Sequence, residues 1–236
     1  MAEVSLPDSV TSLVRGRRAA LHPFDRIEPR RTALLVVDMQ TAFLKEGWPT
    51  ALAAARDIVP AINRLAGAVR RSGGEVVWIV STYGPDEDDR WPILFDHMLG
   101  PAAGGNFRAV LTAGHEGHAI WPLLERRPDD PVVSKNRFSA FCGSNGALEA
   151  LLRRHGIDTV LVVGTVTNIC CESTAREASF RDFKTIMVAD ANAGRSSADN
   201  LATFSSFILA FGDVMTADEV IARLEAGAAP GKAATG

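Results

Sequence analysis

The chain has 236 residues, with 47% hydrophobic and 22% charged side chains and a formal net charge of −3. This is the composition of an ordinary globular protein whose length suits one domain with a sizeable core. A chain without a basic surplus is not expected to bind nucleic acid. Its apolar runs are far shorter than the roughly 20 residues that cross a bilayer, so no membrane partner is expected.

The two ends of the chain differ in character from its middle. Residues 1–29 lack the apolar stretch of a secretory signal and predict a polar arm, whereas the small residues of 227–236 predict a flexible tail. We expect one domain over residues 30–226. The three cysteines, two of them adjacent, do not suit a disulfide framework and favour a reducing compartment, which predicts the cytoplasm.

Five short apolar runs rich in β-branched residues recur along the chain, and a shorter sixth run follows. Runs without polar alternation are typical of strands buried on both faces, as in a parallel sheet covered by helices. The runs lie at residues 32–38, 74–81, 131–135, 158–164 and 184–190, and the sixth opens the segment 213–227.

Helical patterns separate these runs. Apolar residues recur at helical spacing over 58–69 and 148–152, and Thr216 and Glu219 have the spacing of a capping box. The alternation predicts an α/β fold, a three-layer sandwich with a six-stranded, mostly parallel, Rossmann-like sheet.

The segment 83–120 breaks the alternation. It is rich in glycine, proline and charged residues, and it predicts a long irregular insertion. Insertions of this length in a compact domain usually carry function.

Three chemically capable residues stand where predicted strands end. Asp38 closes the first run, Lys135 closes the third, and Cys170 follows the fourth at the start of a helical segment. Because ligands bind beyond the carboxyl ends of parallel strands, a base, a cation and a nucleophile are expected to meet in one crevice. Each residue could instead have a purely structural role. Asp38 would then cap the next segment, Lys135 would be a paired cation, and Cys170 would be a small buried side chain.

The segments around these residues resemble a known family. ALLVVDMQTAF with Asp38, VVSKNRFSAF with Lys135 and GTVTNICCESTAREA with Cys170 are similar, in this order, to the three signatures of the isochorismatase-like cysteine hydrolases, over roughly residues 30–225. The resemblance is nearest to the N-carbamoylsarcosine and ureidoacrylate amidohydrolase branch. It implies a catalytic triad of Asp38, Lys135 and Cys170 and no cofactor.

The same resemblance implies a cis peptide bond between Thr165 and Val166. It also implies an oxyanion hole made by the backbone N–H groups of Val166 and Cys170. Cys171 is then interpreted as a packing residue, and Cys142 as a residue of the same kind that follows Lys135.

Metal binding differs between branches of the family. Nicotinamidases carry an Asp-x-His pair after the second strand, but here that region reads STYGPDEDDRW and the next histidine is His97. We therefore expect no metal and no nicotinamide specificity. His115 and His118 are interpreted as loop or surface residues, because two histidines rarely make a closed metal site.

Substrate contacts are expected from residues near the strand ends and from the insertion. Aromatic walls would give shape, and Arg137 would bind a carboxylate. The candidate substrate-binding residues are Gln40, Trp48, Tyr83, Arg137, Phe138 and Phe141, with Trp91 and Phe107 as further aromatic candidates.

The predicted function is that of a cysteine-dependent hydrolase. It would cleave the C–N bond of a small linear amide, ureido or N-carbamoyl compound through a thioester and release ammonia or an amine. Two alternatives stay open: an isochorismatase-type vinyl-ether hydrolase that uses the aspartate as an acid, and a non-catalytic binding member of the fold. By resemblance we expect a homodimer or homotetramer.

Overall fold

Six strands pair in the order β3-β2-β1-β4-β5-β6, and every neighbouring pair is parallel. The computed structural model describes residues 6–84 and 91–228. The strands span Thr32–Val37 (β1), Glu75–Ser81 (β2), Val132–Lys135 (β3), Thr159–Thr165 (β4), Lys184–Ala193 (β5) and Asp213–Met215 (β6). The order reverses between β1 and β4, which is the point where open parallel sheets bind their ligands.

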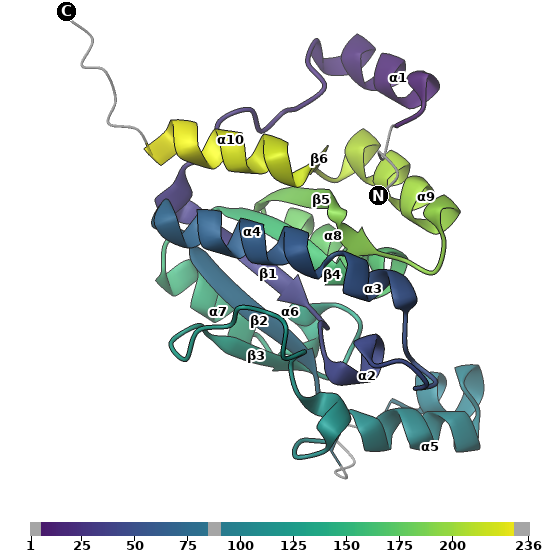
Figure 1. Ribbon diagram of the computed structural model, residues 1–236. Helices are drawn as coiled ribbons and strands as arrows, with labels where there is room; N and C mark the ends of the chain where they lie inside the picture. The colour runs from purple at the N-terminus through teal and green to yellow at the C-terminus, as the bar shows by residue number, and fades with distance from the viewer. Residues whose placement is uncertain (1–5, 85–90, 229–236) are drawn as a thin grey trace, which may run out of the picture.

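Helices cover both faces of the sheet (Figure 1). One face is covered by α2 (Thr41–Leu44), α3 (Ala53–Asp57), α4 (Val59–Arg71) and α10 (Ala217–Ala228). The other face is covered by α6 (Ala140–Gly143), α7 (Ala147–Arg154), α8 (Glu172–Phe180) and α9 (Ser197–Ala210). Leu34 and Val36 point into the first core, whereas Ala33, Leu35 and Val37 point into the second, as the two-residue repeat of a strand requires.

The predicted sheet is confirmed, with one correction at its edge. β3 alternates, because Val132 and Ser134 are exposed while Val133 and Lys135 are buried. The prediction of burial on both faces is therefore wrong for this run. β3 pairs only with β2 and forms the edge of the sheet, so one of its faces meets solvent.

The capping box is confirmed at the start of α10. The Glu219 N–H donates to Thr216 Oγ1 at 3.3 Å, and the Thr216 N–H donates to Glu219 Oε2 at 2.8 Å. These reciprocal bonds satisfy two N–H groups at the first turn of the helix, which is why α10 begins here.

The insertion is more regular than its composition predicts. Residues Ile93–Met98 form a π-helix (η3), Pro101–Val110 form α5, and Glu116–His118 form a 3-10 turn (η4). Gly104 has a packing role within α5, because a Cβ there would lie 2.4 Å from the carbonyl oxygen of Phe95. The expectation of an irregular segment is wrong here, since close packing of α5 on η3 selects a glycine that reads as a helix breaker.

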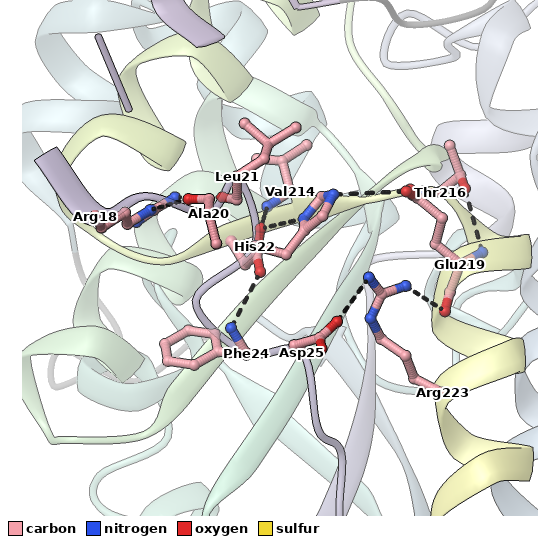
Figure 2. A network of polar contacts seen from close by, with 11 residues as sticks. Arg18, Ala20, Leu21, His22, Phe24, Asp25, Val214, Thr216, Glu219 and Arg223 are labelled. Carbon is pink, nitrogen blue, oxygen red and sulfur yellow. Dashed lines mark hydrogen bonds and ion pairs between the residues drawn. The ribbon is translucent and has the colours of Figure 1, made fainter. Parts of the chain in front are cut away.

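The predicted polar arm contains a helix, α1 (Asp8–Arg18), whose Val14 is buried in the second core. Beyond it the chain is held on β6 and α10 by polar contacts (Figure 2). His22 Nδ1 lies 2.9 Å from Asp213 Oδ1 and His22 Nε2 lies 3.5 Å from Glu219 Oε1, while Arg223 pairs with Asp25. The arm is therefore packed on the domain.

The predicted tail begins within a helix, because α10 runs to Ala228, and the rest of the tail lies outside the described residues. None of the described helices is long and apolar enough to span a membrane.

Candidate active site

Four polar side chains from four neighbouring strands meet at the carboxyl edge of the sheet. Asp38 follows β1, Ser81 ends β2, Lys135 ends β3, and Cys170 lies in the turn after β4. All four side chains are nearly completely buried. The structure thus brings the three predicted residues together and adds Ser81 to them.

Asp38 is placed by its backbone as well as by its position after the strand. Its φ angle is +51°, a left-handed conformation that aspartate tolerates better than most residues. Its N–H donates to the Ile79 carbonyl at 3.0 Å, which continues the ladder between β1 and β2. The kink after this bond directs the carboxylate toward the ends of β2 and β3.

Lys135 lies at the centre of the polar contacts. Its Nζ is 2.8 Å from Asp38 Oδ2 and 3.6 Å from Cys170 Sγ, and it donates to Ser81 Oγ at 2.8 Å. Burial alone would lower the pKa of Lys135, but the negative charge of Asp38 raises it above its ordinary value. The site therefore favours the charged ammonium form of the lysine.

The surroundings of Cys170 favour the protonated thiol. Burial raises the pKa of its thiol far above the ordinary value, the carboxylate of Asp38 raises it further, and Lys135 lowers it. The neighbouring carboxylate cancels much of the effect of the ammonium, so ionisation requires transfer of the proton to another group.

The turn that carries Cys170 is a π-helical turn, η5 (Thr167–Cys171), which leads into α8. The Val166 carbonyl accepts hydrogen bonds from the N–H groups of Ile169 and Cys171, at 3.1 and 3.2 Å. The hydrogen bond from the Cys171 N–H, five residues after Val166, replaces the bond that the Cys170 N–H would donate to the same carbonyl in an α-helix. The peptide bond between Thr165 and Val166 is cis, as the resemblance implies.

Gly164 allows the end of β4 to approach β1. Its φ is +119°, and a Cβ there would lie 2.1 Å from the Val37 carbonyl oxygen. Only glycine fits this contact, which lies one residue before Asp38. The close approach sets the spacing between the aspartate and the cysteine turn.

Gln40 does not serve as the predicted substrate contact, because backbone groups occupy its amide. Oε1 accepts from the Ser81 N–H at 2.8 Å, and Nε2 donates to the carbonyls of Ser81 and His118 at 3.0 and 2.9 Å. The side chain is fully buried. The prediction that Gln40 contacts substrate is therefore corrected. Gln40 instead holds the end of β2 and the loop at His118. Both partners lie far from Gln40 along the chain, so local sequence does not reveal this role.

Tyr83 lies under the insertion and close to the polar group. Its ring packs against Phe95 and Phe107, with centroid distances of 5.1 and 5.8 Å. Burial raises the pKa of the phenol, and its hydroxyl is close enough to Ser81 to form a hydrogen bond. The tyrosine is a neutral wall beside the triad, so its predicted contact with substrate stays a prediction.

A second aromatic group lies near the end of β3, where Arg137 and Phe138 follow Lys135. Trp91 packs edge-on against Phe138 at 4.7 Å between centroids, and the Arg137 guanidinium lies 5.1 Å from the Trp91 ring centroid. The Arg137 carbonyl accepts from Lys135 Nζ at 3.2 Å. Arg137 thereby links the lysine to the insertion.

The two other aromatic candidates lie in packed positions. Phe141 is 2% exposed in the second core, where it packs against Phe183 and under Arg181. Trp48 packs edge-on against His115 and covers Gly117. The prediction that Phe141 contacts substrate is corrected, because α6 turns this ring into the core, and Trp48 serves to fix the loop that carries η4.

A polar hollow of about 710 Å³ opens beside Lys135 at the outer edge of β3. Its lining includes Asn136, Arg137, Cys142 and Asn145. Lys135 is the member of the triad that lines this hollow.

No three His, Cys, Asp or Glu side chains within residues 6–84 and 91–228 are grouped to hold a metal ion. His118 instead contacts Thr82 through Nε2 at 2.7 Å, and His115 accepts from the Gly117 N–H. Both histidines lie in the loop at η4, as predicted.

Comparisons with known proteins agree with this geometry. Residues 32–219 match the Isochorismatase domain family. The chain is 32% identical to the ureidoacrylate amidohydrolase RutB of Methylorubrum extorquens, over 75% of this chain and 77% of that protein. It is also 32% identical to a probable inactive nicotinamidase of Arabidopsis thaliana, over 67% of this chain and 78% of that protein.

Solved structures give the same result. A cysteine hydrolase from Pseudomonas syringae pv. phaseolicola is 31% identical with a TM-score of 0.78, covering 85% of this chain and 95% of that one. The N-carbamoylsarcosine amidase of Thermoplasma acidophilum is 28% identical with a TM-score of 0.64, covering 80% and 97%. With a matched family over most of its length and the same sheet and helices, the chain belongs to the isochorismatase family.

Proposed function

We propose that this protein is a cysteine-dependent amidohydrolase. It cleaves the C–N bond of a small linear amide, ureido or N-carbamoyl compound through a thioester and releases ammonia or an amine. The observation that carries the proposal is the pair of contacts from Lys135 Nζ, 2.8 Å to Asp38 Oδ2 and 3.6 Å to Cys170 Sγ. They bring base, cation and nucleophile to one point.

The first half of the reaction forms the thioester. Because Cys170 is protonated, its sulfur attacks the carbonyl carbon while its proton passes to Asp38. The backbone N–H groups of Val166 and Cys170 are proposed to bind the oxyanion, a contribution of about 3 kcal/mol for one donor. The C–N bond then breaks, and the leaving nitrogen takes the proton from Asp38.

The second half of the reaction hydrolyses the thioester and regenerates the free enzyme. Asp38 takes a proton from water, the resulting hydroxide attacks the thioester carbon, and the C–S bond breaks. The sulfur of Cys170 recovers its proton from Asp38. Lys135 stays paired with the Asp38 carboxylate between the two proton transfers.

The substrate class is supported by the named activities of two relatives, a ureidoacrylate amidohydrolase and an N-carbamoylsarcosine amidase. Both names describe small molecules with a ureido or carbamoyl group and a carboxylate. Arg137, beside Lys135 at the rim, is the cation proposed to receive such a carboxylate.

Ammonia release from a panel of ureido acids, N-carbamoyl amino acids and simple carboxamides tests the proposal. Cys170→Ala should abolish release, whereas Cys171→Ala, which removes a neighbouring buried thiol, should retain it. Full ammonia release by Cys170→Ala would contradict a thiol nucleophile, whereas cleavage of an added vinyl ether by this variant would favour acid catalysis by Asp38. If the wild-type chain binds panel compounds but releases nothing, it is a binding member of the fold.

We also propose that the chain forms a homodimer or homotetramer. The support is the family resemblance. Light scattering coupled to size exclusion measures the mass, and a single species near 25.2 kDa would contradict the proposal.

A further inference from the structure

The hydroxyl of Ser81 stands between the two charged residues of the triad. It donates to Asp38 Oδ1 at 3.0 Å and accepts from Lys135 Nζ at 2.8 Å. Ser81 is 2% exposed, so bulk water does not compete for these bonds.

The direction of these bonds is fixed by the chemistry of the partners. An ammonium can only donate, and an ionised carboxylate can only accept. The Ser81 hydroxyl therefore has a single arrangement while both neighbours are charged, with its one proton on Asp38 Oδ1.

The two carboxylate oxygens of Asp38 have different partners as a result. Oδ1 accepts from the Ser81 hydroxyl, whereas Oδ2 lies 2.8 Å from the Lys135 ammonium. Contacts on both oxygens hold the carboxylate in one orientation at the strand ends.

Ser81 is itself held in place. The amide of Gln40 bonds both its N–H and its carbonyl, at 2.8 and 3.0 Å, so the backbone at the end of β2 cannot rotate. The serine is thus a fixed support and not a mobile hydroxyl.

We propose that Ser81 is a positioning residue that orients the Asp38 carboxylate as the proton acceptor for Cys170. This inference rests on the proposed function, because it concerns proton transfer from the thiol. Ser81 does not touch substrate in this role and acts through Asp38.

The first test is kinetic. Ser81→Ala should lower kcat by about 10- to 100-fold, the range expected for one hydrogen bond to a charged group. It should leave KM within about threefold, because no substrate contact is removed. Ser81→Thr keeps the hydroxyl and should recover most of the loss. Ser134→Ala removes an exposed hydroxyl on the adjacent strand and is the matched control.

The second test needs no substrate. The rate of iodoacetamide incorporation at Cys170, read by peptide mass spectrometry at pH 7, should fall in Ser81→Ala and recover in Ser81→Thr. If Ser81→Thr is displaced by its extra methyl group, Ser81→Cys keeps the size and should give an intermediate rate. Thermal unfolding of each variant separates a loss of fold from a loss of proton transfer.

The outcomes distinguish the two proposals. If Cys170 labelling depends on Ser81 but no panel compound is hydrolysed, the proposed function fails and the role of Ser81 stands. If ammonia is released and Ser81→Ala keeps wild-type kcat and labelling, the role of Ser81 is overturned. A rise in KM with unchanged kcat would also overturn it, since it would mean a substrate contact.

Discussion

Lys135 and Asp38 face each other across the ends of two strands that are not neighbours in the sheet. Nζ and Oδ2 are 2.8 Å apart, and the two side chains are 0% and 1% exposed. Ser81, at the end of the intervening β2, forms hydrogen bonds with both of them. A buried pair of this kind is costly to break, because removing one partner leaves the other charge without compensation.

Lys135→Met is therefore expected to reduce both stability and activity. The free energy of unfolding should fall by about 3–5 kcal/mol, and kcat by at least roughly 100-fold. Chemical denaturation and the ammonia assay measure the two effects. The double variant Asp38→Asn/Lys135→Met removes both charges and should regain most of the stability but none of the activity. A single variant as stable as the wild type would contradict the account of the pair.

Asp38→Asn should separate ionisation of the thiol from turnover. The charge of Asp38 raises the pKa of Cys170 and that of Lys135 lowers it, so removing the first and keeping the second must lower this pKa. The ultraviolet absorbance of the thiolate, followed against pH, should show ionisation at lower pH than in the wild type. Ammonia release should be lost, because the leaving nitrogen has no proton donor. A midpoint that stays the same or rises would refute the assigned charges.

Arg137→Ala should impair binding of acidic substrates selectively. We expect KM for a ureido acid to rise about 10- to 100-fold, the loss typical of a charge-assisted contact, and KM for a neutral amide to change little. Arg154→Ala removes an equal charge from the exposed end of α7 and is the control. Equal effects of Arg137→Ala on both substrates would mean that Arg137 supports the structure of the site through its contacts with Trp91 and Lys135 and does not bind the carboxylate.

His22→Ala should weaken the attachment of the N-terminal arm to β6. The variant leaves the fully buried Asp213 carboxylate without its imidazole partner, and we expect a loss of about 1–3 kcal/mol in the free energy of unfolding. Urea denaturation measures it, with the exposed His97→Ala as control. The catalytic residues lie at the ends of β1, β3 and β4 and not at β6, so kcat should not change. A loss equal to that of the control would mean that the arm adds nothing to stability.

Some features of this protein follow from local sequence alone. Uninterrupted Val, Ile and Leu runs identify buried strands because a strand covered on both faces needs no polar position. Asp38, Lys135 and Cys170 stand out because charged or reactive residues at the ends of such runs are unusual. The capping box at Thr216 is equally local, since both partners lie within one turn.

Other features arise only when distant segments meet. Ser81 closes an apolar run as an ordinary residue, and its role appears once β2 lies between β1 and β3. Gln40 looks like a pocket residue until the end of β2 occupies its amide. Phe141 looks like an aromatic wall until α6 turns it into the core. In each case the decisive partner lies about 40 residues away along the chain.

The sequence by itself thus determined the strands, their order along the chain and the chemical types at their ends, because these depend on periodicity and on residue identity. The tertiary structure alone decided that Asp38 Oδ1 accepts from Ser81, that the charge of Asp38 raises the pKa of Lys135, and that burial raises the pKa of Cys170. The physical reason is that hydrogen-bond partners and the electrostatic cost of burial are properties of the assembled site, not of any segment that contributes to it.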